Sequence, residues 1–398
     1  DRSPSRGLGD VYKRQIINCL MMKEHYLLEK DIIFLNHGSF GACPKSVFKN
    51  YQNWQRLLEN QPVQFFSHDV YKYLEESRTH LSNLITCDSD DIIFIPNPTT
   101  AINTVIRSLM VDKNYEVLTS NHEYGAMIRA WEWFSKNKGY TLTQKHLRIP
   151  FTTRDKFLDN LWEGITKKTK IIFISHITSP TAIIFPVEEI CHRARNEGIL
   201  TIIDGAHVPG HIQLDISALD PDIYIGACHK WLSAPKGSSF MYVKKDTQDM
   251  IDPLIISWGK EVDPSPSTFI NENQYQGTRD FSPYLAVPTA INFQNDNNWN
   301  LVKARCKGLT KKTLISLQNV LKTDLLCPIN DDWLAQMASI QIPVNDSLAI
   351  KNKLLNNYNI EIPIFKWDNK NMLRFSFNAY NDESDSTALI DAINKIFS

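Results

Sequence analysis

The stretch "GILTIIDGAH" (Gly198–His207) joins a short apolar run to a polar end, and "PDIYIGACHK" (Pro221–Lys230) repeats that pattern. Both runs are almost continuously apolar, as is typical of strands buried on both faces of a parallel sheet. In such a sheet, ligands bind at the edge formed by the carboxyl ends of the strands. The sequence therefore predicts that Asp204 and Lys230, each at the end of its strand, lie at one edge of one sheet.

From about residue 85 to 245, strand-sized apolar runs alternate with helical patterns, which indicates an α/β fold with helices covering a parallel sheet. Further strands are predicted within residues 91–96, 115–120 and 169–176. One helix follows the first of these strands, with Ile102, Val105, Ile106 and Leu109 on one face. A second helix is predicted to begin at Pro186 and to stop at Gly198.

After about Asp246 the alternation weakens, and "EVDPSPSTF" (Glu261–Phe269) reads as a polar loop interrupted by prolines. A helix-rich stretch follows from Pro288, and the chain ends in "NMLRFSFNAYN" and an amphipathic helix, which together favour a smaller C-terminal α+β domain. We expect four parts: a non-native or disordered extension (1–20), a segment joining the small domain to the active site (21–50), a large domain (51–287) and a small domain (288–398).

The overall composition excludes several classes of protein. With 43 Lys and Arg against 44 Asp and Glu, the 398-residue chain has a net charge of -1, which disfavours a nucleic-acid binder. No apolar run reaches the 18 or so residues that a membrane span needs, so no membrane partner is expected. The seven cysteines are scattered and form no CxxC, which indicates reduced thiols in the cytoplasm and no zinc or other metal site.

Three features at strand ends point to one kind of chemistry. Asp204 is a carboxylate that could hold a cationic ring nitrogen, or could merely cap a helix. Lys230 supplies an amine at the same sheet edge. The loop from Asn97 to Thr100 precedes a helix and could hold a phosphate, or be a plain threonine N-cap. A lysine amine, a carboxylate and an anion cradle are together what pyridoxal 5'-phosphate requires of a protein.

Given these residues, the chain resembles the class V aminotransferase family of fold-type I pyridoxal-phosphate enzymes, and in particular its isopenicillin N epimerase-like branch. The matching strings occur in order over residues 32–398: "LNHGSFG" (35–41), "NPTTAIN" (97–103), "HEYGA" (122–126), "HITSPTAIIFPVEEI" (176–190), "DGAHVPG" (204–210), "CHKWLSAPKGSSF" (228–240), "QGTRD" (276–280) and "LRFSFNAYN" (373–381). The resemblance implies a large domain with a mostly parallel seven-stranded sheet flanked by helices, and a smaller C-terminal α+β domain.

The resemblance also implies roles for individual residues. Lys230 would bind the cofactor as an imine (Schiff base) and then serve as base for the Cα proton. Asp204 would pair with the pyridinium nitrogen. The phosphate would be held by Thr99, Thr100 and His229, with Thr278 reaching in from a neighbouring subunit. Because Thr278 would come from a second subunit, a homodimer with a shared active site is expected. For His229, the alternative to binding phosphate is simple packing beside Lys230.

Further residues are assigned to the cofactor and the substrate by the same resemblance. His207 and Ser179 would contact the phenolic oxygen or the phosphate of the cofactor. Tyr124, rather than His122, would stack on the ring, unless Tyr124 is a buried core residue. Arg374 would grip the carboxylate of an amino-acid substrate bidentately. His37, Ser39 and Arg279 are expected either to line the substrate pocket or to be structural.

The expected reaction begins with proton loss at Cα of an amino acid or of a small molecule that ends in one. Epimerisation is the leading hypothesis, with His37 and Tyr124 as candidate second proton donors; a C–S or other β-lyase and an aminotransferase are alternatives. No cysteine lies between Cys327 and Arg374, which disfavours persulfide chemistry. A non-catalytic binding module is the rival of a different class. A nicotinamide dehydrogenase is set aside because its glycine-rich turn is missing.

Overall fold

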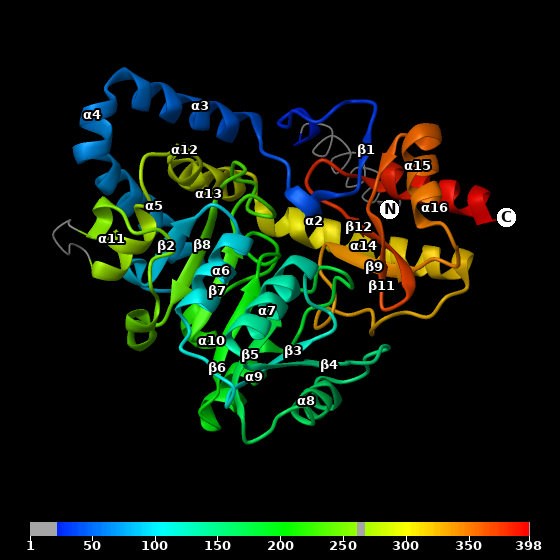
Figure 1. The fold of residues 1–398 in the computed structure, drawn as a ribbon. Coiled ribbons are helices and arrows are strands. Elements are labelled where there is room, and N and C mark those ends of the chain that lie inside the picture. Colours follow the sequence, from blue (N-terminus) through cyan, green and yellow to red (C-terminus); the bar gives the residue numbers. More distant parts are fainter. Residues whose placement is uncertain (1–21, 261–266, 398) are drawn as a thin grey trace, which may run out of the picture.

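The predicted ligand-binding edge belongs to a seven-stranded sheet. In the computed structural model, which describes residues 22–260 and 267–397, the strand order is β2-β8-β7-β6-β5-β3-β4 (Figure 1). β8 runs antiparallel to β2 and β7, and the other neighbours are parallel. The bounds are β2 Ile92–Ile95, β3 Glu116–Ser120, β4 Thr141–Lys145, β5 Thr169–Ser175, β6 Leu200–Gly205, β7 Ile223–Ala227 and β8 Ser239–Val243. The predicted mostly parallel sheet and its strands are confirmed.

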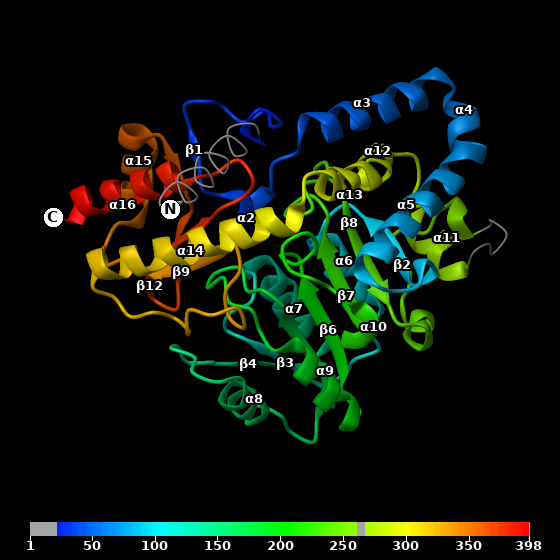
Figure 2. The same cartoon turned by 180° about the vertical axis from the view of Figure 1, so that it is seen from behind.

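Helices cover both faces of this sheet, because successive strand residues point to opposite sides. Ile93 and Ile95 of β2 pack with one set of helices, whereas Ile92 and Phe94 pack with the other. Figures 1 and 2 show the two layers from opposite sides. The first layer contains α6 (Pro98–Ser108) and α7 (Gly125–Lys138); the second contains α9 (Val187–Asn196) and α10 (Ile216–Leu219). The helix predicted between Pro186 and Gly198 is confirmed as α9, and the apolar face predicted after β2 is confirmed for Ile102, Val105 and Ile106, whereas Leu109 lies just beyond the end of α6.

The N-terminal and C-terminal parts of the chain meet beside the sheet. β1 (Ile33–Phe34) pairs in parallel with β10 (Ile360–Glu361), and α2 (His37–Phe40) follows β1 at once. A second, three-stranded antiparallel sheet has the order β11-β12-β9. Its strands are β9 Met337–Gln341, β11 Ile364–Trp367 and β12 Lys370–Ser376, flanked by α14 Trp299–Leu321, α15 Ser347–Tyr358 and α16 Glu383–Phe397. This is the smaller α+β unit that the sequence predicts; the domain boundaries themselves stay a prediction.

The remaining helices connect these parts. They are α3 Lys45–Asn60, α4 Pro62–Gln64, η1 Phe65–Asp69, α5 Val70–Ile85, η2 Ser89–Asp91, α8 Arg154–Trp162, η3 Lys245–Met250, η4 Trp258–Lys260, α11 Thr268–Gln274, α12 Ser282–Leu285 and α13 Val287–Asp296. The predicted loop 261–269 is partly wrong, since Ser267 caps α11 and Thr268 begins it. Residues 261–266 and the predicted extension 1–20 lie outside the described residues. Among those described, no helix has the length and apolarity to cross a membrane.

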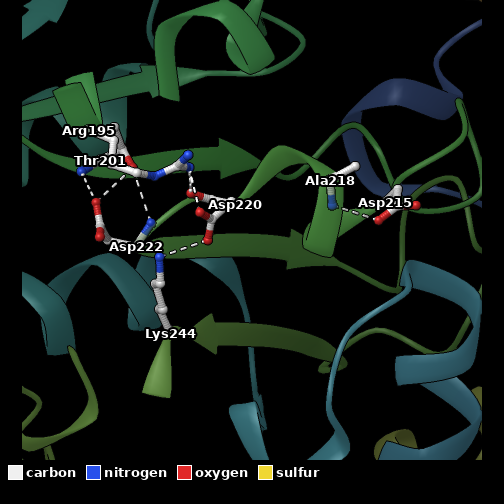
Figure 3. Close-up of polar contacts among 7 residues, drawn as sticks. All are labelled: Arg195, Thr201, Asp215, Ala218, Asp220, Asp222 and Lys244. Atoms are coloured by element: carbon white, nitrogen blue, oxygen red, sulfur yellow. Dashed lines mark hydrogen bonds and ion pairs between the residues drawn. The ribbon is translucent and has the colours of Figure 1, made fainter. Parts of the chain in front are cut away.

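A polar cluster ties the amino-terminal ends of β6 and β7 together (Figure 3). Asp220, which ends α10 with a left-handed φ of 47°, pairs with Arg195 of α9 at 2.7 Å and with Lys244 at 2.9 Å. Asp222 accepts hydrogen bonds from the backbone N–H of Thr201 at 2.7 Å and from its hydroxyl at 2.9 Å. The cluster lies at the end of the strands opposite to Asp204, so it supports the sheet and is remote from the ligand-binding edge.

Replacing Asp220 with alanine is expected to lower the free energy of unfolding by about 1–2 kcal/mol. The substitution removes the partly exposed ion pairs of Asp220 with Arg195 and with Lys244. It also places alanine at a left-handed φ of 47°, a backbone conformation that alanine adopts less readily than aspartate. Thermal and urea unfolding would measure the change. Asp220→Asn is the matched control, since it keeps the backbone tolerance and should cost less. Equal stability of Asp220→Ala and the unsubstituted protein would contradict this account.

Candidate active site

A cavity of about 390 Å³ lies at the carboxyl ends of β2, β5, β6 and β7. The predicted cofactor residues that line it are Thr99, Tyr124, Ser179, Asp204, His207, His229 and Lys230. Ser39 and Arg374, predicted to bind substrate, also line it. A larger cavity of about 610 Å³, which borders α9, α10 and α14, contains none of the predicted site residues. The sheet edge therefore gathers most of the predicted site into one place.

Asp204, near the end of β6, and Lys230, in the loop that follows the neighbouring strand β7, both line this cavity. The Asp204 side chain is 4% exposed and accepts a hydrogen bond from the backbone N–H of Ala206 at 3.0 Å. Burial raises the pKa of Asp204, opposed by that N–H and by Lys230. Burial lowers the pKa of Lys230 to about 8, although Asp204 acts in the opposite direction. An amine with such a pKa is partly in its neutral, nucleophilic form near neutral pH.

Close packing behind the Asp204 carboxylate leaves no room for a side chain at the next position. A Cβ atom built on Gly205 would lie 2.1 Å from the ring of Tyr224 on the neighbouring strand. Tyr224 is fully buried, and its hydroxyl lies 3.0 Å from the Nδ1 atom of His176. The glycine that follows Asp204 is thus required by the approach of β7 to β6.

At the start of α6 the sequence predicts either an anion cradle or a threonine N-cap, and the threonine N-cap is wrong. Asn97, not a threonine, caps the helix: its Oδ1 accepts from the backbone N–H of Thr100 at 2.8 Å and from the Thr100 hydroxyl at 3.1 Å. Thr100 does not line the cavity, whereas Thr99 does. The positive end of the α6 dipole and Thr99 therefore remain available to an anion.

His229 and Tyr124 also occupy the cavity wall. The Nδ1 atom of His229 lies 3.0 Å from the carbonyl of Ser238, and burial lowers the pKa of its imidazole to about 4. The neutral ring donates through Nδ1, so binding phosphate through Nε2 would require a second proton. Tyr124 is 47% exposed, which makes the buried-core alternative wrong. His122 is buried outside the cavity, 2.8 Å from the Thr181 hydroxyl.

Arg374, on β12, places in the cavity wall a guanidinium that has no carboxylate partner among the described residues. Its side chain is 5% exposed and donates to the carbonyl of Ser179 at 2.6 Å and to the hydroxyl of Ser39 at 3.0 Å. It forms no ion pair with any residue that the structure describes, and burial lowers its pKa to about 10. A desolvated cation without an anion is costly, so a ligand carboxylate would compensate it.

Besides Thr100, three predicted residues, His37, Thr278 and Arg279, do not line the cavity of their own chain. His37 is fully buried, with Nδ1 2.8 Å from the Tyr380 hydroxyl and Nε2 3.0 Å from the carbonyl of Lys230. Burial also lowers its pKa to about 3. Of the two alternatives kept for His37, the structure favours the structural one, because its Nε2 also lies 2.7 Å from the side-chain amide of Asn378 and the residue does not line the cavity. Arg279 donates to the Tyr284 hydroxyl at 2.5 Å, and it lies with Thr278 outside this cavity.

The structure also shows a carboxyl group that sequence reasoning did not identify. Glu123 is 5% exposed, and its oxygens accept hydrogen bonds of 2.5 Å from the hydroxyls of Ser120 and Ser175. Burial raises its pKa to about 8. Ser175 lines the cavity and pairs with Asp204 across β5 and β6. The signal in the sequence was an acidic residue in "HEYGA", between a buried strand and Tyr124.

The cysteines of the described chain do not contribute to this site. No cysteine among residues 22–260 and 267–397 lines the cavity. Cys327 is buried, and burial raises the pKa of its thiol to about 12. Such a thiol is protonated at neutral pH and is a poor nucleophile.

Comparisons with known proteins agree with this geometry. The sequence profile of the family described as "Aminotransferase class-V" matches residues 34–389. The chain is 29% identical to isopenicillin N epimerase from Streptomyces clavuligerus over 384 residues, covering 93% of this chain and 96% of that one. It is 26% identical to hercynylcysteine sulfoxide lyase from Schizosaccharomyces pombe over 382 residues, covering 92% and 94%.

A solved structure of a C-DES mutant, with glycine covalently linked to its PLP cofactor, has a TM-score of 0.83 to this chain. The two are 18% identical, and the match covers 94% of this chain and 99% of the other. A likeness at that identity shows the fold, and it confirms the fold-type I architecture.

Replacing Glu123 with glutamine is expected to flatten the pH dependence of stability. The Glu123 pKa rises from the ordinary 4.5 to about 8 on folding, so its contribution to stability is present below pH 4.5 and is lost as pH rises to about 8. The variant should therefore unfold at a higher temperature than the unsubstituted protein near pH 8. Thermal unfolding of cofactor-free protein between pH 5 and 8 measures this. Glu188→Gln, at an exposed position, is the control; parallel profiles for all three proteins would refute the assignment.

Proposed function

The chain belongs to the class-V aminotransferase family and is a pyridoxal-phosphate-dependent enzyme; from this premise we propose that it acts at Cα of an α-amino acid or of a small molecule ending in one. Epimerisation is the leading reaction. The observation that carries the proposal is Arg374, a buried guanidinium without an anionic partner, in the same cavity as Lys230. The Arg374 guanidinium would donate two parallel hydrogen bonds to the oxygens of a substrate carboxylate, which would neutralise its charge.

The residues present fit pyridoxal phosphate. The amine of Lys230 has a pKa near 8, the buried carboxylate of Asp204 can pair with a cationic ring nitrogen, and Thr99 at the start of α6 can receive a phosphate. When bound, the cofactor draws electrons away from the substrate Cα and so weakens the bonds there. His207 lines the same cavity and would donate a hydrogen bond to a cofactor oxygen.

Each side chain then has a separate task. Lys230 would hold the cofactor, and its amine would accept the proton from the substrate Cα. Asp204 supports the positive charge of the ring nitrogen, since a buried carboxylate is strongly stabilised by such a partner. Arg374 fixes the substrate carboxylate, which sets the orientation of Cα toward the Lys230 amine. Ser39 and Ser179 hold the Arg374 guanidinium in place.

Epimerisation also requires a proton donor on the opposite face of Cα, and Tyr124 is the better of the two predicted candidates. Its phenol lines the cavity and is partly exposed. His37 is buried outside the cavity, and both of its ring nitrogens have partners in the protein. We therefore assign the second proton transfer to Tyr124.

A β-lyase is the second candidate function. It is supported by the similarity to hercynylcysteine sulfoxide lyase and by the fold shared with the cystine C–S lyase C-DES. The same Cα deprotonation serves both reactions, and loss of a substituent at Cβ then competes with reprotonation. A persulfide-forming desulfurase is disfavoured, because no described cysteine lines the cavity.

Incubation with a panel of L-amino acids in deuterated water separates these reactions. Deuterium at Cα with loss of chirality identifies an epimerase, and a Tyr124→Phe variant should then exchange the proton without inverting the centre. Release of sulfide, a sulfenate or pyruvate from a β-substituted substrate identifies a lyase, and a keto acid with aminated cofactor identifies an aminotransferase. Failure of borohydride to fix the cofactor on Lys230 would overturn the proposal as a whole.

We also propose a homodimer in which Thr278 enters the partner's cavity. Thr278 lies outside the cavity of its own chain. The segment leading to η4 exposes large apolar side chains, namely Met250, Ile255, Ile256 and Trp258, which is typical of a surface that is covered in an assembly.

The dimer is tested by light scattering, with an expected mass of twice 45.8 kDa. Trp258→Glu should shift the protein toward the monomer and weaken cofactor binding at the same time, because the partner's residues leave the cavity. Glu substitution at Leu348, another exposed apolar residue, is the control. A monomer that binds cofactor fully would contradict the shared site.

Replacing Arg374 with glutamine is expected to raise KM for an amino-acid substrate by about 100-fold, the loss that follows from about 3 kcal/mol of charge-assisted hydrogen bonding. The absorbance of the bound cofactor should change little, since Arg374 is assigned to the substrate. Steady-state kinetics and spectra measure the two effects. Arg148→Gln, at an exposed position, is the matched control, and an unchanged KM in Arg374→Gln would remove the main support for an amino-acid substrate.

A further inference from the structure

A short chain of ring nitrogens leads to the amine of Lys230. The indole Nε1 of Trp231 donates to Nδ1 of His207 at 3.3 Å. The other ring nitrogen of His207, Nε2, lies 3.2 Å from Nζ of Lys230. Trp231 is 1% exposed and His207 is buried. His207 therefore connects the side chain of Lys230 to that of Trp231, the next residue in the sequence.

The direction of the first hydrogen bond determines the rest. An indole nitrogen can only donate, so Nδ1 of His207 must be an acceptor and carry no proton. A neutral imidazole has one N–H, which in this case is on Nε2. That N–H points at Nζ of Lys230. An ammonium has three donors and no acceptor, so the contact forms a hydrogen bond only when the Lys230 amine is neutral.

We propose that Trp231 is a positioning residue, which holds His207 in the Nε2–H form and through it favours the neutral, nucleophilic amine of Lys230 before the cofactor binds. The inference rests on the proposed function, in which that amine receives the cofactor. The same N–H is the donor that His207 presents to the cavity.

The surroundings hold Trp231 in this position. His211 stacks on the indole with ring centroids 3.6 Å apart and an interplanar angle of 11°. The His211 ring is itself fixed at both nitrogens: Nδ1 lies 2.8 Å from the carbonyl of His207, and Nε2 accepts from the backbone N–H of Gln336 at 2.9 Å. The carbonyl of Trp231 accepts a hydrogen bond of 2.8 Å from the side chain of Gln294. Turning the indole N–H away from His207 would break the stack with His211, and the Gln294 hydrogen bond fixes the backbone of Trp231.

The charges around His207 act in the same direction. Burial lowers its pKa well below 6.5, and Lys230, Arg374, His211 and His229 lower it further. Asp204 is the carboxylate that acts on Lys230 from the neighbouring strand. A doubly protonated His207 would in addition direct its Nδ1–H at the indole N–H. The neutral form of His207 is therefore favoured by geometry as well as by electrostatics.

The tautomer of His207 can be observed directly. In the full-length, cofactor-free protein, labelled with nitrogen-15 in its histidines, the His207 signals should show a protonated Nε2 and an unprotonated Nδ1 at pH 7. Comparison with His207→Gln assigns those signals. In Trp231→Phe, which retains a ring against His211, the His207 signals should move toward a mixture of tautomers. A protonated Nδ1 in the unsubstituted protein, or unchanged signals in Trp231→Phe, would overturn the proposal.

The effect on Lys230 needs a second measurement. An amine-reactive reagent modifies Lys230 only in its neutral form, so the modification rate measured at a series of pH values gives the midpoint for deprotonation of Lys230. Mass analysis of peptides identifies Lys230 as the modified residue. In Trp231→Phe the midpoint should rise by about one pH unit, because His207 can then accept a hydrogen bond from the Lys230 ammonium. Trp131→Phe is the matched control, since Trp131 is fully buried and its indole nitrogen has no partner among the described residues.

These outcomes are separate from those of the proposed function. If borohydride fails to attach the cofactor to Lys230 in every protein, the proposed function fails, whereas the tautomer of His207 stands. If the cofactor attaches normally but the midpoint is equal in Trp231→Phe and Trp131→Phe, the role of Trp231 fails and the proposed function is unaffected. A midpoint that rises equally in both variants would identify a loss of general packing and would also overturn the role of Trp231.

Discussion

Burial of charge at the carboxyl ends of the strands is the constraint on which this structure depends. Lys230, Asp204 and Arg374 are all withdrawn from water in or around one cavity. Each would be costly to bury alone. Arg374 has no carboxylate partner among the described residues, and the charge of Lys230 depends on its contacts with Asp204 and His207. An anionic ligand would compensate the buried positive charge of Arg374.

The cavity is completed by chain segments that are distant in sequence. β1 and α2 lie against the C-terminal unit through the pairing of β1 with β10. A Cβ atom at Gly41 would lie 2.1 Å from the carbonyl of His229, so the end of α2 is packed directly on the backbone that carries Lys230. Nε2 of His37 lies 3.0 Å from the carbonyl of Lys230 and 2.7 Å from the side-chain amide of Asn378, and the hydroxyl of Ser39 accepts a hydrogen bond from Arg374. The N-terminal segment therefore links the lysine of the large sheet to the arginine of the small one.

Neutral groups matter as much as charged ones in this site. Burial disfavours the imidazolium forms of His207 and His229 and the carboxylate form of Glu123. These groups can hold protons or hydrogen bonds without adding charge near Asp204 and Lys230. Such an arrangement leaves Asp204 as the main negative charge available to a cationic ring.

The sequence alone determined the sheet and the positions of Asp204 and Lys230 at its edge. A buried parallel strand is recognisable as a continuous apolar run, and the polar residues that follow the run mark its carboxyl end. This is why Asp204, Lys230 and Thr99 could be placed together. The motif around Arg374 identified it from its resemblance to the family. Tertiary structure alone decided the fate of His37, whose motif suited a pocket but whose ring is enclosed by Tyr380 and the backbone of Lys230. It also revealed Glu123 and the Trp231–His207 contact, since protonation state and tautomer depend on burial and on partners that are far apart along the chain.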